Sequence, residues 1–569
     1  MKRTKKLTAL TAAACVALSS AAMPVLAEEP GTYTDVLRGL QTEAVSQLEE
    51  SYRDFYDKLG EGFAEEATAE LTLGEAAGAL IQTMGVDLSW FDNLTLSETV
   101  SGVDSTITGD GALLLNGTEI ATVSELFDMA GKAVYFAIPE ISEQDFKIDL
   151  NKALELAAES TQDISSQIEE YGEETEGLDE YIDEEGITES TESALAMLAL
   201  LTKFNSLKDI QAGIPSPEIV AGVYAKAADM VFNHLTDAGS VEVNQNVNGI
   251  SQEGTSYTAT MSPEEMIAYT SELLHGMQES QLVQWLYTVY FADAAEMSYE
   301  EFAASLGEAA EEIESTDPAE LGDFNLETSV VLDAEGNVIG ETSTTSVEGE
   351  DFTIGFATAN DGAKSGLHFE ANIPESMTGT EAADIVLSGS GDVDAAGAVT
   401  GDYVIAVNDE PVANIHADNA VYDKETGECA GSLTISLVVP EDTQDVQMLL
   451  MGTFTLKVDY DIAVEYSTVA LTLGMSGADV ATLKITDAVS DPAQFAGART
   501  AADYEPAVDA LDQNALNEAA QNINVNGLLQ NAVNAGMPET FIEDIMTLFA
   551  GAPEDTYEGS ADIAAEPVA

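Results

Sequence analysis

Apolar residues recur every three or four positions between residues 33 and 64, which is the spacing of one face of an α-helix. Charged residues such as Arg38 and Arg53 lie off this stripe. The pattern predicts an N-terminal amphipathic helix within residues 28–66, whose apolar stripe requires a partner surface in the body of the protein. The stripe consists of Leu37, Leu40, Ala44, Leu48, Tyr52, Phe55, Leu59 and Phe63.

The pattern changes after this helix, and residues 67–262 are predicted to form a first α+β lobe. Alternating polar and apolar residues predict a strand at 67–73, and a short helix is expected near residues 76–84. Residues 94–138 have the pattern of strands separated by turns. The dipeptide Asn116-Gly117, placed between two apolar runs, predicts a hairpin there.

Helical patterns dominate the middle of the chain. Residues 142–237 are predicted to form a helical insertion in the first lobe, and residues 241–260 a second hairpin that turns near Gly249. A helical segment is expected over residues 263–320. Two capping signatures open its helices, Ser262-Pro263-Glu264-Glu265 and Ser298-Tyr299-Glu300-Glu301.

Residues 321–490 are predicted to form a β-rich second lobe. Between residues 453 and 466, polar and apolar residues alternate strictly. This run predicts one long strand, or a bent pair of strands, in a large curved sheet with one buried face. Glycine-rich stretches, among them Gly389-Ser390-Gly391, are expected to be turns between the strands. The apolar members of the run, and candidates to line a ligand site or a filled core, are Phe454, Leu456, Val458, Tyr460 and Ile462.

Helix returns after residue 490, with C-terminal helices expected over residues 491–552 and a disordered acidic tail over residues 553–569. The fold class predicted from the whole pattern is α+β. We expect one or two large curved antiparallel sheets of half-barrel type, with helical insertions and helical N- and C-terminal segments.

The net charge of the chain limits the classes of molecule that it can bind. The chain of 569 residues has 18 Lys and Arg against 104 Asp and Glu, a formal net charge of −86. Such a surface repels phosphate backbones and anionic membranes, which excludes nucleic acid, and it favours basic proteins or calcium as partners. Because 45% of residues are hydrophobic, the chain is expected to be globular. The acidic stretch 168–185 is interpreted as a solvated face, since no EF-hand spacing occurs in it.

Residues 1–27 have the features of a secretory signal peptide, with basic residues before an apolar stretch and small residues ending at Ala27. An uncleaved membrane anchor and a lipid-modified Cys15 are the alternatives. No later stretch is long and apolar enough to predict a transmembrane segment in the mature chain. The sequence therefore predicts a bacterial protein that is secreted, or loosely associated with the cell surface, after cleavage near Ala27.

No constellation of residues points to catalysis. The histidines outside the signal segment, His234, His275, His368 and His416, lack metal-ligand spacing. Flanking carboxylates would raise the pKa of the Cys429 thiol, so this cysteine is expected to be inert. Phosphate-binding and dinucleotide-binding motifs are missing from the sequence. We therefore predict a protein that is not an enzyme, with no catalytic residues, no metal site and no cofactor.

The order of these parts resembles a known superfamily. A helix, then a curved sheet of alternating strands with helical insertions, is similar to the half-barrel lipoprotein carriers of the LolA, LolB and LppX type. It is also similar to large secreted proteins of Gram-positive bacteria related to them. The segments that carry the resemblance are residues 113–117, 135–142, 333–340 and 453–466. The resemblance implies an apolar concavity for an acyl chain, with helices as a lid, and no catalytic residues.

Two hypotheses follow. The first is a secreted, non-enzymatic binding protein that holds an apolar or amphipathic, lipid-like ligand in a half-barrel concavity. The second is an acidic extracellular surface protein that contacts basic partners or calcium without a small ligand.

Overall fold

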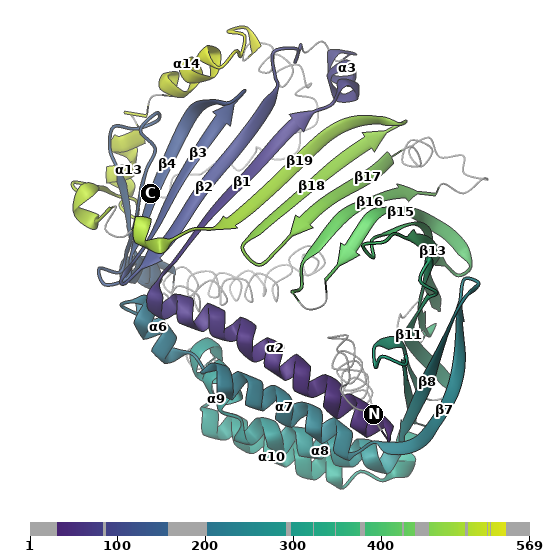
Figure 1. Ribbon diagram of the computed structural model, residues 1–569. Helices are drawn as coiled ribbons and strands as arrows, with labels where there is room; N and C mark the ends of the chain where they lie inside the picture. Colours follow the sequence, from purple (N-terminus) through teal and green to yellow (C-terminus); the bar gives the residue numbers. More distant parts are fainter. Residues whose placement is uncertain are drawn as a thin grey trace, which may run out of the picture.

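The chain forms an α+β structure with one large open sheet of 20 strands and several helices (Figure 1). The prediction of an α+β fold built on a large antiparallel sheet is confirmed. The computed structural model describes residues 31–83, 87–157, 202–291, 297–322, 324–347, 349–375, 382–423, 426–438, 454–495, 499–520, 522–523 and 525–541.

Strands occur in two runs along the chain. The first run comprises β1 (Phe63–Leu73), β2 (Asn93–Val103), β3 (Thr106–Leu115), β4 (Thr118–Asp128), β5 (Ala133–Ala137), β6 (Phe146–Asp149), β7 (Thr236–Val247) and β8 (Ile250–Met261). The second run comprises β9 (Asn325–Leu332), β10 (Val338–Val347), β11 (Glu350–Asn360), β12 (Lys364–Ile373), β13 (Ala383–Val393), β14 (Val399–Val407), β15 (Glu410–Tyr422), β16 (Cys429–Leu437), β17 (Phe454–Ile462), β18 (Tyr466–Met475), β19 (Ala478–Val489) and β20 (Val508–Asp509).

Helices precede the first run, interrupt it, separate the two runs and follow the second. The α-helices are α2 (Tyr33–Glu61), α3 (Glu75–Thr83), α6 (Leu207–Gly213), α7 (Pro217–Asn233), α8 (Pro263–Glu279), α9 (Gln281–Leu286), α10 (Tyr299–Glu314), α13 (Gln513–Ala520) and α14 (Asn526–Asn534). Shorter turns are the π-helical η1 (Tyr287–Phe291) and the 3-10 helices η2 (Pro318–Leu321), η3 (Pro492–Gln494) and η4 (Ala501–Asp503). The two predicted capping boxes are present, with Ser262 and Glu265 opening α8 and Ser298 and Glu301 opening α10.

Pairing places the strands in one continuous row. The order is β20-β6-β5-β4-β3-β2-β1-β19-β18-β17-β16-β15-β14-β13-β12-β11-β10-β9-β8-β7. All neighbours are antiparallel except β20 and β6, which are parallel. Because β1 pairs with β19, strands from both predicted lobes share one sheet.

Helix α2 spans the curve of this sheet, as Figure 1 shows, and connects its two ends. Its 29 residues extend about 43 Å at 1.5 Å per residue. Helix α7 lies beside it, and polar contacts join the two. The Gln41 amide donates to the Ala225 carbonyl over 2.7 Å, and Arg53 is 2.8 Å from Glu218. The hydrogen bond from Arg53 lowers the pKa of the Glu218 carboxyl.

Two hydrophobic cores anchor the ends of α2. At its N-terminal end, Tyr33, Val36 and Leu37 pack with residues of α7, α8, β8 and β9, including Val330. At its C-terminal end, Leu59 packs with Met129 and with residues of α6 and β3. Helix α2 is therefore fixed to the sheet at both ends of the curve.

Hairpin β7–β8 folds back onto the neighbouring strands. Val247 and Ile250 pack against Ala359 of β11. The Gln245 amide donates to the carbonyls of Ile339 and Thr358 over 2.6 and 2.7 Å. These contacts join the end of hairpin β7–β8 to β10 and β11.

Of the two alternatives for residues 453–466, one long strand is wrong, because β17 ends at Ile462 and a tight turn leads into β18, with the Ala463 N–H donating to the Tyr466 carbonyl. Two other local predictions are wrong. Gly389-Ser390-Gly391 lies inside β13, where a Cβ on Gly389 would meet the Asp402 carbonyl oxygen of β14. Residues 146–149 form strand β6 and not helix, because they pair with β5 and β20.

Several predictions concern residues that lie outside the ranges that the structure describes. These are the signal peptide 1–27, the acidic stretch 168–185 with most of the helical insertion around it, most of the last predicted helix, and the tail 553–569.

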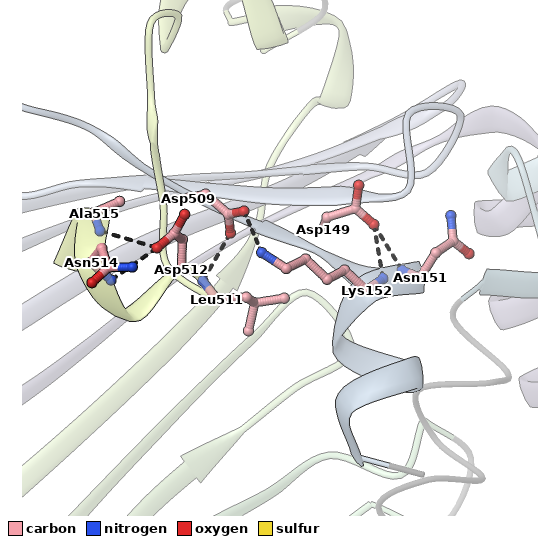
Figure 2. Close-up of polar contacts among 8 residues, drawn as sticks. All are labelled: Asp149, Asn151, Lys152, Asp509, Leu511, Asp512, Asn514 and Ala515. Carbon is pink, nitrogen blue, oxygen red and sulfur yellow. Dashed lines mark hydrogen bonds and ion pairs between the residues drawn. The ribbon is translucent and has the colours of Figure 1, made fainter. Parts of the chain in front are cut away.

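The segment after β19 is tied to the sheet edge through β20 and its charged neighbours. Lys152 Nζ lies 2.6 Å from Asp509 Oδ2, and Asp509 also accepts the Leu511 N–H (Figure 2). The hydrogen bond from Lys152 is the main cause that lowers the pKa of Asp509. Arg499 is 2.7 Å from Asp110 of β3. Scarce basic side chains thus join this segment to the first strands.

We expect Lys152→Met to loosen β20 from β6 without unfolding the sheet. Both partners are partly exposed, so the loss is expected to be below about 1 kcal/mol. Amide hydrogen exchange at residues 508–510 should therefore rise a few-fold. The Asp509 carboxyl has a lower pKa in the folded protein than in the unfolded chain, where the pKa is about 3.9. Its contribution to stability is therefore complete above that pH and is lost only as the pH falls below it. The effect of Lys152→Met should consequently be the same at pH 6 and pH 8.

The matched control is Lys226→Met, which removes a looser pair with Glu279 between α7 and α8. It should leave exchange at residues 508–510 unchanged. Equal exchange in the wild type and Lys152→Met would show that this ion pair does not hold β20.

Candidate apolar binding face

The five candidate residues lie on one face of β17. Strand residues two apart point to the same side, so Phe454, Leu456, Val458, Tyr460 and Ile462 form one row along the strand. The intervening residues, which include Lys457 and Asp459, point to the opposite side.

Cross-strand register extends this face in both directions. Leu456 lies opposite Leu473 of β18 and Ile435 of β16, and Val458 lies opposite Leu471 and Leu433. Toward β1, the same register brings in Val469, Leu483, Ile485, Ala69 and Leu71. Toward β13, it brings in Ala413, Ile415, Tyr403, Ile405 and Leu387.

This is the face that α2 covers at its two ends. On one side the row continues from Leu387 through Phe369 to Phe356, and Phe356 packs against the core that contains Tyr33. On the other side it continues from Ala69 to Leu96 and Leu113. Ile107 shares that face of β3 and packs with Leu59. We call this surface of β12–β19, β1 and β2 the inner face.

Between the two cores, large aliphatic side chains of the inner face are exposed. Leu456 is 38% exposed, Leu473 and Ile485 are each 40% exposed, and Leu96 is 49% exposed. Ten neighbouring strands at about 4.8 Å each give this face a width of roughly 45 Å. An aliphatic surface of this extent is unusual for a protein without an apolar partner.

The opposite, outer face of the same strands is polar. On β16, Ser432, Thr434 and Ser436 alternate with the inner-face residues. Hydroxyl pairs cross between strands, as between Thr472 and Thr482 at 2.9 Å. The sheet is therefore amphipathic, with an aliphatic inner side and a hydroxyl-rich outer side.

Two tyrosines supply the phenol groups near the centre of the inner face. Partial burial raises the pKa of both Tyr403 and Tyr460, so each phenol stays neutral and can donate one hydrogen bond at neutral pH. Gly431 lies opposite Tyr460 at a φ of 149°, and a Cβ there would come within 3.0 Å of Tyr460 Oη. The same Cβ would come within 2.7 Å of the Ala420 Cα, so the glycine leaves room for both the neighbouring backbone and the Tyr460 hydroxyl.

One edge of the inner face is acidic. Glu98 of β2 and Asp487 of β19 flank Ala67 in the same cross-strand row, and Glu65 follows two residues along β1. This edge would attract a cationic group and repel an anionic one.

The histidines do not gather at this face, whereas Cys429 lies at one end of it, opposite Ile462. His234 Nε2 is 2.7 Å from Glu272 between α7 and α8, and His416 Nδ1 is 2.8 Å from Asp402 on the outer face. His275 lies on α8 and His368 on β12. Cys429 begins β16 and is half-buried. Among the residues that the structure places, no group of three or more His, Cys, Asp or Glu could hold a metal ion.

Comparisons with protein-family models, with curated proteins and with solved structures found no match to this chain. In the described part of the chain, no helix is long and apolar enough to cross a membrane.

Proposed function

We propose that this protein is a secreted, non-enzymatic binding protein that holds an apolar or amphipathic, lipid-like ligand against the inner face of a half-barrel. The observation that carries the proposal is the continuous aliphatic surface between the two cores of α2. Leu456 and Leu473 face each other there and are more than one third exposed.

The strands of the inner face favour an acyl chain over a peptide. Every strand from β12 to β19 has a hydrogen-bonded neighbour on both sides, so its backbone has no free edge for a peptide. The surface therefore offers mainly apolar contact, worth about 0.8 kcal/mol for each buried methylene group. A hydrocarbon chain needs no hydrogen bonds from its site and fits this chemistry.

The acidic edge formed by Glu98, Asp487 and Glu65 favours a particular headgroup. A zwitterionic or cationic headgroup can lie there, whereas an anionic headgroup is repelled by these carboxylates and by the net charge of −86. We therefore expect the protein to prefer phosphatidylcholine over phosphatidylglycerol.

Native mass spectrometry of residues 28–569 tests this function. The protein is incubated with vesicles of phosphatidylcholine or of phosphatidylglycerol and then separated from them. We expect a lipid adduct of stoichiometric intensity with phosphatidylcholine and a weaker one with phosphatidylglycerol. An unchanged protein mass after both treatments would contradict the proposal.

A second candidate function is that of an acidic extracellular surface protein that contacts basic partners or calcium. The net charge of −86 favours it. Capture of a defined basic partner that is lost at high salt would support this candidate, provided that no lipid binds.

A further inference from the structure

The two edges of the sheet differ sharply in length. The edge strand β20 has two residues, whereas the edge strand β7 has 12. Proteins commonly protect sheet edges with short strands, lysine, proline, bulges or a covering segment. Strand β7 contains no Lys, Arg or Pro, and its bulge lies near its start, between Asp237 and Gly239.

The backbone of β7 presents hydrogen-bonding groups to solvent. The two-residue turn Asn248-Gly249, with φ of 52° and 84°, makes Val247 and Ile250 the closing hydrogen-bonded pair. In an antiparallel ladder alternate residues then point their N–H and C=O groups away from the partner. For β7 these outward residues are Ser240, Glu242, Asn244 and Asn246.

This edge is exposed and already ordered. Residues 236–242 are all exposed, and the Val241 side chain is 61% exposed. In the part of the chain that the structure covers, β7 pairs with β8 alone, and Figure 1 shows it at the outer margin of the sheet. The Asn248 amide donates to the carbonyls of Leu367 and Gly389, which fixes the tip of the hairpin. An added strand would meet a preorganised template.

The charge of hairpin β7–β8 indicates which kind of strand would pair with its edge. Neither β7 nor β8 carries a Lys or Arg, while Glu242 and Glu253 lie along the edge hairpin. A second copy of this chain would bring like charges together at the edge, on top of the repulsion between two molecules of net charge −86. A basic segment gains from both effects.

We propose that the outer edge of β7 binds an extended, basic segment of another protein by strand addition. Main-chain hydrogen bonds to Ser240, Glu242 and Asn244 supply the geometry, and the carboxylates of Glu242 and Glu253 supply the preference for Lys and Arg. This inference is independent of the lipid-like ligand, because β7 lies outside the inner face.

Fluorescence anisotropy with a labelled nine-residue peptide that alternates lysine with valine and threonine tests this proposal on residues 28–569. Asn244→Pro removes one outward N–H and leaves the ladder to β8 intact, because this N–H points away from β8. We expect it to weaken peptide binding at least tenfold, a loss of about 1.4 kcal/mol. The matched control, Asn244→Ala, keeps the backbone donor and should bind within twofold of the wild type.

A second arm needs no altered protein. N-methylation of alternate residues along one edge of the peptide removes its hydrogen-bond donors there, and it should abolish binding to the wild type. Equal binding of the methylated peptide, or of Asn244→Pro, would show that net charge alone attracts the peptide. No binding of the lysine peptide would also overturn the proposal. A dimer in sedimentation velocity that Asn244→Pro dissociates would assign the edge to a second copy instead.

Discussion

Leu456→Asp is expected to lower lipid binding more than any other single substitution on β17. Leu456 is 38% exposed and lies between Leu473 and Ile435, near the centre of the inner face. A carboxylate there would have to lose its hydration beneath a bound acyl chain, or the chain would have to leave that area. We expect a loss of at least tenfold in affinity for phosphatidylcholine, about 1.4 kcal/mol, measured by native mass spectrometry or by retention after gel filtration.

The matched control is Thr434→Asp, which adds the same charge to the outer face of the neighbouring strand. Thr434 lies opposite Lys457, so the new carboxylate gains a favourable neighbour. This variant should bind phosphatidylcholine as the wild type does. Equal losses in both variants would mean that net charge, and not the inner face, controls lipid binding.

Tyr33→Ala is expected to destabilise the protein strongly, because Tyr33 anchors the N-terminal end of α2. Its side chain is 1% exposed, and its hydroxyl is 2.8 Å from Thr328 Oγ1 on β9. Removing a buried aromatic ring costs about 3–5 kcal/mol, and Thr328 loses a hydrogen-bond partner as well. Urea unfolding of the wild type and the variant measures the loss.

Phe55→Ala on the same helix provides the comparison. Phe55 is 51% exposed, so its removal should cost less than about 1 kcal/mol. Tyr33→Phe should fall between the two, since it loses the hydrogen bond and keeps the ring in the core. A similar cost for Phe55→Ala and Tyr33→Ala would contradict the role of Tyr33 as the residue that anchors the N-terminal end of α2.

Local signals in the sequence were sufficient for much of the secondary structure. The turn at Asn116-Gly117 requires positive φ at both residues, and the observed angles are 51° and 73°. The capping box at Ser262 depends on residues within one helical turn. Such features were predictable because the residues that specify them are neighbours in the chain.

Long-range pairing and one turn were not predictable in the same way. Thr68 of β1 contacts Thr486 of β19, and nothing in an alternating pattern names the partner strand. The turn between β17 and β18 contains Val464 and Glu465 and has none of the glycine or asparagine residues that usually mark a turn. Because polar and apolar residues also alternate through this turn, the sequence does not reveal it.

The sequence predicts which residues of β17 share the inner face, but it does not predict whether that face is covered. Period-two alternation assigns Leu456 and Val458 to one side of their strand, and the register confirms that they share it. The alternation cannot show whether that side is covered. Coverage depends on which helices pack on that side. These are α2, through the cores around Tyr33 and Leu59 at its two ends, and α14, through the core that contains Leu115.

Photo-crosslinking tests the central claim most directly. A phosphatidylcholine that carries a diazirine near the end of its acyl chain is bound to residues 28–569, irradiated and mapped by peptide mass spectrometry. We predict that crosslinks concentrate on the inner-face residues of β16–β19, with Leu456, Val458 and Leu471 among them. Crosslinks confined to α7–α10, or to outer-face residues such as Thr434, would contradict the account.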